Sequence, residues 1–159
     1  MKITQVRNAT LIIEFGEVRL LLDPMLAGAG QLPGLKLLTR SRRRNPLVEL
    51  PDNVGELLEG VTHCLITHCQ KGHFDHLDRA GVRWLRERRL PVICMAEDTD
   101  YLRRLRLNVH QVLSAQAASP LLGGSVRPIA CLHGEGLIGR LMAHGHGYFI
   151  QMPGEPSLY

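Results

Sequence analysis

Short apolar runs alternate with helix-like segments through the middle of the 159-residue chain, and this alternation constrains its fold more than any other feature. Residues 64–67, 91–95 and 109–113 are short apolar runs typical of buried strands. Residues 77–89 carry apolar side chains at helical spacing, and residues 97–105 form a second helix-like segment. Strands joined through helices usually lie parallel, so the pattern predicts an α/β fold whose functional groups gather beyond the carboxyl ends of the strands.

Strands of a different kind are expected on both sides of this region. They cover residues 3–6, 10–15, 18–22, 125–132 and 141–152. Gly16 and Glu17 form a tight turn between the second and third of them, and the last two resemble longer antiparallel strands. Residues 27–53 have no sustained period and are predicted to be a long surface loop, followed by one helical turn at residues 54–58. The predicted fold is therefore mixed α/β.

The composition favours a single domain over residues 1–159. A hydrophobic fraction of 45% can supply one sizeable core, and a charged fraction of 21% is ordinary for a globular domain. No run approaches the roughly 18 apolar residues that span a bilayer, and the chain begins with a strand-like pattern instead of a signal peptide. We therefore expect a cytoplasmic protein without a membrane partner.

The net charge of +4 comes largely from arginines in residues 40–44, 83–89 and 103–106. Such runs can neutralise the phosphates of a nucleic acid or of a small substrate. Two of the three runs fall on helix-like segments, where arginines commonly occupy the solvent-exposed face, and no aromatic residues interleave with them to stack on bases. The pattern therefore does not favour a nucleic-acid partner.

The four cysteines form no Cys-x-x-Cys pair, which argues against a disulfide framework and against a zinc ribbon. Cys64, Cys94 and Cys131 lie in apolar runs and are expected to pack as small hydrophobic side chains. Cys69 directly follows His68 in a histidine-rich stretch. It is therefore a candidate to compete as a soft metal ligand.

This histidine-rich stretch is the strongest indication of chemistry. His73, Asp75 and His76 offer two imidazoles and a carboxylate within four residues, and His68 adds a further nitrogen. These ligand types suit zinc and related divalent ions. Because the stretch follows a predicted strand and precedes a predicted helix, it predicts a metal site at the carboxyl edge of the sheet.

The same stretch carries a family resemblance. Thr67-His68 through His73-Phe74-Asp75-His76-Leu77-Asp78 resembles the His-x-His-x-Asp-His signature of the metallo-β-lactamase superfamily, placed after a strand and before a helix. Residues 8–14, 22–25 and 153–159 are similar to the branch that includes ascorbate-6-phosphate lactonase-like hydrolases. The resemblance covers essentially the whole chain. It implies the N-terminal half to two-thirds of an αββα sandwich.

Carried over by position, the resemblance implies a ligand set. It assigns His68, His73 and His133 to one metal and Asp75 and His76 to a second, so one or two divalent ions are expected, with zinc favoured over manganese or iron. The implied activity is hydrolysis of an ester, lactone or phosphoester bond in a small molecule, including phosphorylated ones, by metal-bound hydroxide. Asp75 would be catalytic, because a carboxylate there can orient the attacking water.

The spacing of the first two histidines departs from the family pattern. Residues 69–72 separate His68 from His73, where the family has one residue, so three are extra. Either His68 keeps its place and the loop bulges before His73, which Gly72 would ease, or Lys71 takes the position of the first ligand. Under both alternatives, metal affinity is expected to suffer, because preorganised geometry is much of what a site supplies.

A second departure lies at the end of the sequence. In the family, the strand that matches residues 157–159 continues into a Gly-Asp-Thr segment whose aspartate bridges the metals, and a last histidine follows. The resemblance therefore implies a truncated, incomplete domain that lacks two ligands. Unpaired sheet edges and an uncovered apolar face would favour a homo-oligomer or a complementing second chain.

Three functions follow from these observations. The favoured one is a metal-dependent hydrolase. The first alternative is a catalytically inactive remnant that acts as an interaction module, because the implied ligand set is incomplete. The second alternative is a nuclease, because the superfamily includes nucleases and the chain is basic.

Three other polar residues are further candidates for the site. His144 and His146 share one face of a predicted strand and could bind a metal, but their position in the family is a structural strand. Asp23 follows the predicted strand at residues 18–22, and we expect its carboxylate to accept a hydrogen bond from a metal-binding histidine.

Overall fold

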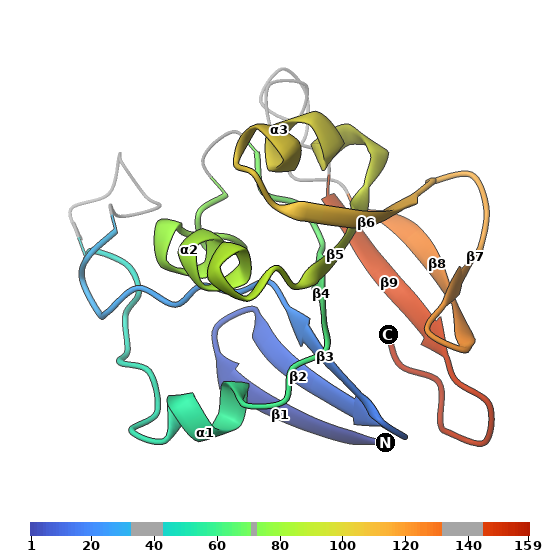
Figure 1. Ribbon diagram of the computed structural model, residues 1–159, viewed down its shortest axis with the longest axis horizontal. Helices are drawn as coiled ribbons and strands as arrows, with labels where there is room; N and C mark the ends of the chain where they lie inside the picture. The colour runs from blue at the N-terminus through green and yellow to red at the C-terminus, as the bar shows by residue number, and fades with distance from the viewer. Residues whose placement is uncertain (33–42, 71–72, 132–144) are drawn as a thin grey trace.

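The computed structural model describes residues 1–32, 43–70, 73–131 and 145–159, which form two β-sheets with helices against one of them (Figure 1). The larger sheet has six strands in chain order: β1 (Lys2–Arg7), β2 (Thr10–Phe15), β3 (Val18–Leu22), β4 (His63–Ile66), β5 (Pro91–Met95) and β6 (Asn108–Leu113). The smaller sheet contains β7 (Ser119–Leu121), β8 (Gly124–Cys131) and β9 (Gly145–Gln151). The helices are α1 (Val54–Leu58), α2 (Arg79–Arg88) and α3 (Thr99–Arg104), the last preceded by a 3₁₀ turn, η1 (Ala96–Asp98).

Strand directions in the larger sheet follow the predicted alternation. β1, β2 and β3 are antiparallel, and pairing of Phe15 with Val18 confirms the hairpin turn at Gly16 and Glu17. β3, β4, β5 and β6 are all parallel, so their carboxyl ends meet at one edge of the sheet. Since β4 lies between β3 and β5, the residues that follow these three strands are brought together.

Alternate side chains of the central strands divide the core into two layers. Leu65 and Ile93 face the smaller sheet and pack in one cluster with Val126 and Ile150. Their neighbours along the strands, such as Ile66, face the other way and pack beneath α2 and α3. This period of two, with both faces buried, explains why the parallel strands are continuous apolar runs in the sequence.

Helix α2 begins beside the histidine-rich stretch, and its start is fixed by a cap. The Asp78 carboxylate accepts hydrogen bonds from the backbone N–H of Gly81 at 2.7 Å and from the backbone N–H of Ala27 at 2.7 Å. Gly81 packs directly on Pro24, where a Cβ atom would lie 2.1 Å from the Pro24 carbonyl oxygen. The N-terminus of α2 is therefore held against the segment that follows β3 by a hydrogen bond and by close packing.

The solvent side of the helical layer agrees with the sequence analysis. The arginines of α2 and α3 are exposed, as predicted from the helical spacing. None of the helices in the described residues is long and apolar enough to cross a bilayer. The predicted helix at residues 97–105 divides into η1 and α3, and the buried side chain of Asp98 lies at the junction.

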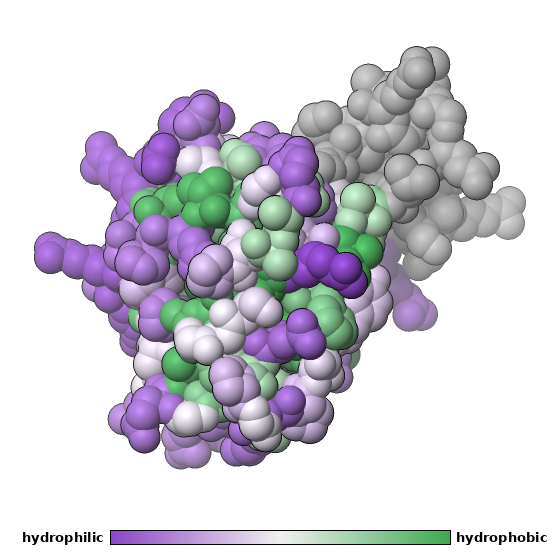
Figure 2. Space-filling model, turned by 90° about the vertical axis from the view of Figure 1, so that its right-hand side faces the viewer, coloured by the Kyte–Doolittle hydropathy of each residue, from purple (hydrophilic) through white to green (hydrophobic). Residues whose placement is uncertain are grey.

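The smaller sheet covers the second face of the larger one, and Figure 2 shows hydrophobic side chains among polar ones on the surface there. Tyr148 of β9 is buried, and its hydroxyl donates 3.4 Å hydrogen bonds to the carbonyl oxygens of Ile66 and Thr67. The predicted packing of Cys131 is wrong, because this residue ends β8 in an exposed position. Strand β7 has only three residues, including Pro120, and is too short for periodicity to predict.

Candidate metal centre

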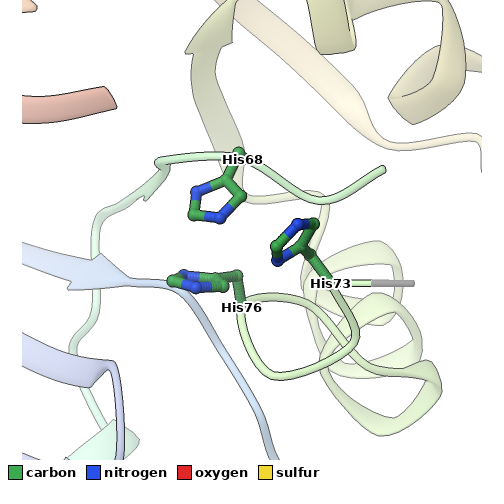
Figure 3. A group of neighbouring side chains, drawn as sticks. All are labelled: His68, His73 and His76. Carbon is green, nitrogen blue, oxygen red and sulfur yellow. The ribbon is translucent and has the colours of Figure 1, made fainter. Parts of the chain in front are cut away.

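Three histidines converge beyond the carboxyl end of β4 (Figure 3). One ring nitrogen from each of His68, His73 and His76 lies within 4.8 Å of the others. The ring centroid of His68 is 4.5 Å from that of His73 and 4.0 Å from that of His76. His68 is 4% exposed, so the cluster is closed on one side by the body of the protein. Such a group of imidazoles is the donor set that zinc prefers.

Local backbone structure explains how residues separated by this spacing meet. His68 follows β4 directly after Thr67, whereas His73 and His76 lie on tight turns that precede α2. The backbone N–H of His73 donates to the carbonyl oxygen of Gln70 at 3.3 Å, and that of His76 donates to the carbonyl oxygen of His73 at 3.2 Å. These turns fold the loop back over the end of the strand.

Asp23 holds the cluster from the neighbouring strand, as the sequence predicted. It follows β3 with φ +44°, a left-handed conformation that aspartate tolerates better than most residues, and its side chain is 3% exposed. Asp23 Oδ2 lies 2.8 Å from Nδ1 of His76, and Asp23 Oδ1 accepts the backbone N–H of Thr67 at 2.8 Å. A carboxylate that receives the second ring nitrogen of a metal-binding histidine fixes the orientation of that ring.

Thr67, which the sequence analysis did not single out, determines which nitrogen is available on His68. Its hydroxyl donates to Asp23 Oδ2 at 2.7 Å and lies 3.0 Å from Nδ1 of His68. Because the hydroxyl proton is directed to Asp23, the Thr67 oxygen accepts from Nδ1–H of His68. The lone pair of His68 is then on Nε2, and the bond to Asp23 places that of His76 on Nε2 as well.

Burial and charge shift the pKa values of this pair. Burial raises the pKa of Asp23, and its hydrogen bonds to His76 and Thr67 only reduce the rise. Burial lowers the pKa of His76, but the hydrogen bond and charge of Asp23 and the charge of Asp75 outweigh it, so the pKa lies above its ordinary value. A proton therefore competes with a metal ion for His76 at higher pH than it would for an ordinary histidine.

Asp75 lies beside the three histidines without joining their compact group. Its Oδ1 is 3.8 Å from Nδ1 of His73, and its Oδ2 is 3.7 Å from Nε2 of His76. Asp75 Oδ1 is buried and has no hydrogen-bond partner among the described residues. A buried carboxylate oxygen next to imidazole nitrogens is an acceptor suited to a cation.

The residues of the cluster fit a divalent metal. The donor set is three imidazoles and one carboxylate, the ring orientations are fixed through Asp23 and Thr67, and one carboxylate oxygen is left for a cation. His68, His73, His76 and Asp75 would hold the ion. Their roles as ligands, and the catalytic role of Asp75, stay predictions.

Of the two alternatives for the stretched spacing, the geometry agrees with the first, in which His68 keeps its place. His68 meets His73 and His76 across the loop. Lys71 and Gly72 lie outside the described residues, as do His133 and His144. The predicted role of His133 therefore stays a prediction. His146 is buried on β9 and is not part of the three-histidine group.

The expectation that Cys69 competes as a ligand does not fit its position. Cys69 is buried in the core beneath the helices, with Cys94 and Leu102 in the same cluster. Burial, together with the charge of Asp98 and a hydrogen bond to it, raises the pKa of the Cys69 thiol far above its ordinary value. The thiolate that binds metals is therefore strongly disfavoured.

Sequence comparison identifies relatives among metal-dependent hydrolases. The chain is 27% identical over 166 residues to a UPF0173 metal-dependent hydrolase from Azorhizobium caulinodans, an alignment that covers all of this chain and 61% of that protein. It is 40% identical over 75 residues to the UPF0173 protein YddR from Bacillus subtilis, which covers 47% of this chain and 30% of that one. No protein-family model matches. The chain thus spans less than two-thirds of the length of these relatives.

Solved structures share the fold. A structure described as "a possible metal-dependent hydrolase" from Veillonella parvula superposes with a TM-score of 0.82 and 24% identity over 98% of this chain and 60% of that one. The isothiocyanate hydrolase from Delia radicum gut bacteria gives a TM-score of 0.78 and 26% identity, covering 99% of this chain and 60% of that one. The metallo-β-lactamase fold protein YhfI from Bacillus subtilis gives a TM-score of 0.52 and 11% identity, covering 91% of this chain and 51% of that one.

Proposed function

We propose that this chain, which has the metallo-β-lactamase fold and UPF0173 metal-dependent hydrolases among its relatives, forms the metal-binding part of a hydrolase. The observation that carries the proposal is the convergence of His68, His73 and His76 within 4.8 Å, at the edge where the parallel strands end. Three imidazoles and a carboxylate suit zinc, manganese and iron. Zinc is the favoured ion, because most of the donors are imidazoles.

The residues of the site have different proposed roles. His68, His73 and His76 present ring nitrogens to the ion, and Asp23 and Thr67 fix two of these rings. Asp75 would bind the ion through its buried Oδ1, which no described residue satisfies, and its other oxygen would orient the attacking water toward the substrate. When bound, the ion lowers the pKa of water and polarises the bond under attack.

The proposed substrates are small molecules with an electrophilic centre that water can attack. Esters, lactones and phosphoesters are the bond types that the sequence resemblance implies. The similarity to an isothiocyanate hydrolase supports a further candidate, since the carbon of an isothiocyanate group is also open to attack by water. The chain covers 61% of one relative and 30% of another, so the substrate is proposed for this chain and is not carried over from them.

Metal content is the first test. The purified chain should bind about one equivalent of zinc, measured by elemental analysis after dialysis, and His68→Ala should abolish this binding. His110→Ala is the matched control, because His110 is exposed on β6. Less than about 0.1 equivalents of zinc, manganese and iron in the wild type would contradict the proposal and favour the inactive interaction module.

Hydrolysis is the second test. The zinc-loaded chain is assayed with a chromogenic ester, a lactone, a phosphodiester and an aryl isothiocyanate, each against His68→Ala and Asp75→Asn. We expect turnover of at least one substrate that both variants lose. Turnover that is unchanged in Asp75→Asn would contradict the role of this carboxylate. Cleavage of RNA or DNA with metal dependence would instead identify the nuclease alternative.

A further inference from the structure

The stretched loop between His68 and His73 is anchored to the neighbouring strand by contacts that have no part in the ligand set. Cys69 is 5% exposed and packs in the core cluster beneath the helices. The side-chain amide of Gln70 donates to Asp98 Oδ1 at 2.9 Å and to the carbonyl oxygen of Glu97 at 2.5 Å. Two consecutive residues of the loop are therefore held in place, Cys69 by the core and Gln70 by η1.

Asp98 is well placed to serve as this anchor. It is 0% exposed and lies in η1, directly beyond the carboxyl end of β5. Because β5 pairs with β4, η1 lies beside the point where the loop leaves β4. A buried carboxylate is costly unless hydrogen bonds compensate it, and the side-chain amide of Gln70 donates one such bond from the loop. This bond therefore holds the described part of the loop, Cys69 and Gln70, beside η1.

We propose that Asp98 and Gln70 are positioning residues that hold the lengthened loop so that His68 and His73 reach the same ion. This inference rests on the proposed metal-binding function. His68 precedes Cys69 and His73 follows the anchored pair by three residues, so the anchor lies between the two ligands. Without it, the extra residues would let the two rings separate, and metal binding would have to restore the order at a cost in affinity.

Gln70→Ala is the primary test, because Gln70 is only partly buried and its removal should leave the fold intact. The matched control is Gln111→Ala, which removes a side-chain amide bond of the same kind, to the carbonyl oxygen of Pro120 at 2.6 Å. We expect Gln70→Ala to weaken the binding of zinc, measured by chelator competition, about three- to tenfold. Gln111→Ala should leave the zinc affinity unchanged, and both variants should show similar thermal stability without metal.

A second variant and two further measurements report on the loop directly. Asp98→Asn should weaken zinc binding at least as much as Gln70→Ala, and the double variant should lose no more than Asp98→Asn alone, because both changes break one network. In the metal-free protein, hydrogen exchange of the loop amides should be faster in Gln70→Ala than in Gln111→Ala. The absorption spectrum of bound cobalt should change in Gln70→Ala only.

The outcomes separate the inference from the function on which it rests. If the wild type binds zinc and Gln70→Ala binds it equally well, the inference is overturned while the metal site stands. An equal loss of affinity in Gln111→Ala would assign the effect to general stability and also overturn it. A wild type that binds neither zinc nor cobalt would overturn the proposed function and the inference together.

Discussion

Two buried aspartates flank the end of β4, one from each neighbouring strand, and they serve the candidate metal centre in different ways. Asp23 follows β3 and bonds to His76 itself and to Thr67, which in turn orients His68. Asp98 lies just beyond β5 and accepts a hydrogen bond from Gln70, which lies between two candidate ligands in the chain. Asp23 therefore orients rings, whereas Asp98 orients backbone.

The two kinds of contact should differ in how much their loss weakens metal binding. A ring that loses its carboxylate partner loses both orientation and tautomer, and these act directly on the metal bond. A loop that loses its anchor can still reach the bound geometry, at the cost of ordering a few residues. We therefore expect substitution of Asp23 to weaken metal binding more than substitution of Asp98.

Removal of a candidate ligand should reduce zinc affinity most, whether the ligand is next to Asp23 or next to the loop held by Asp98. His76→Ala on the Asp23 side and His73→Ala beside the anchored loop should each weaken zinc binding by about a hundredfold or more, because each removes one metal bond. Chelator competition measures the affinity, with His110→Ala as the exposed control. A loss confined to one of the two variants would show that the three-histidine group does not act as one site.

Asp23→Asn should have the second-largest effect, with zinc affinity reduced about 10- to 100-fold. An asparagine can still accept the backbone N–H of Thr67 through its oxygen, but its amide nitrogen cannot accept from Nδ1 of His76. Asp52→Asn, an exposed aspartate far from these contacts, is the control. If Asp98→Asn proved the more damaging of the two, the ranking of ring over backbone would be wrong.

Gly81→Ala tests whether the packing of α2 on the segment after Asp23 is rigid. The added Cβ atom would lie 2.1 Å from the Pro24 carbonyl oxygen, directly after Asp23, so α2 must shift. We expect a loss of about 1–3 kcal/mol in the free energy of unfolding, measured by urea denaturation. Gly55→Ala in α1 meets no atom within 4 Å and should be neutral or slightly stabilising. A neutral Gly81→Ala would show that this contact yields easily.

The smallest expected effect is a shift in pH dependence. The pKa of His76 lies above its ordinary value, and metal binding requires the neutral ring, so zinc affinity should fall as pH falls through that pKa, by about tenfold per pH unit. In Asp23→Asn two of the causes that raise the pKa disappear, so the fall should begin at a lower pH. Titration of zinc affinity from about pH 8 to about pH 5.5 measures both curves. Coincident midpoints would contradict the coupling to Asp23.

Much of the fold follows from local patterns. The strands β2, β3 and β5 and the helix α1 have the predicted bounds, since two-residue alternation, apolar runs and turn residues are properties of short segments. The position of the three-histidine group also follows, because its members lie close together in the chain and occur where a strand ends. Asp23 was predictable for the same reason, as the residue that ends β3.

Local sequence therefore predicts the strand pattern, the types of candidate ligand and the edge of the sheet at which they gather. The folded chain brings His68 close to His73, buries Cys69 in the core, and places Thr67 beside His68 and Asp98 beside Gln70. Several of these features depend on contacts between residues far apart in the chain, such as Gln70 with Asp98, 28 positions apart, and Thr67 with Asp23, 44 positions apart. Periodicity and spacing report only on neighbours in the chain, whereas such contacts exist only once the sheet has aligned its strands.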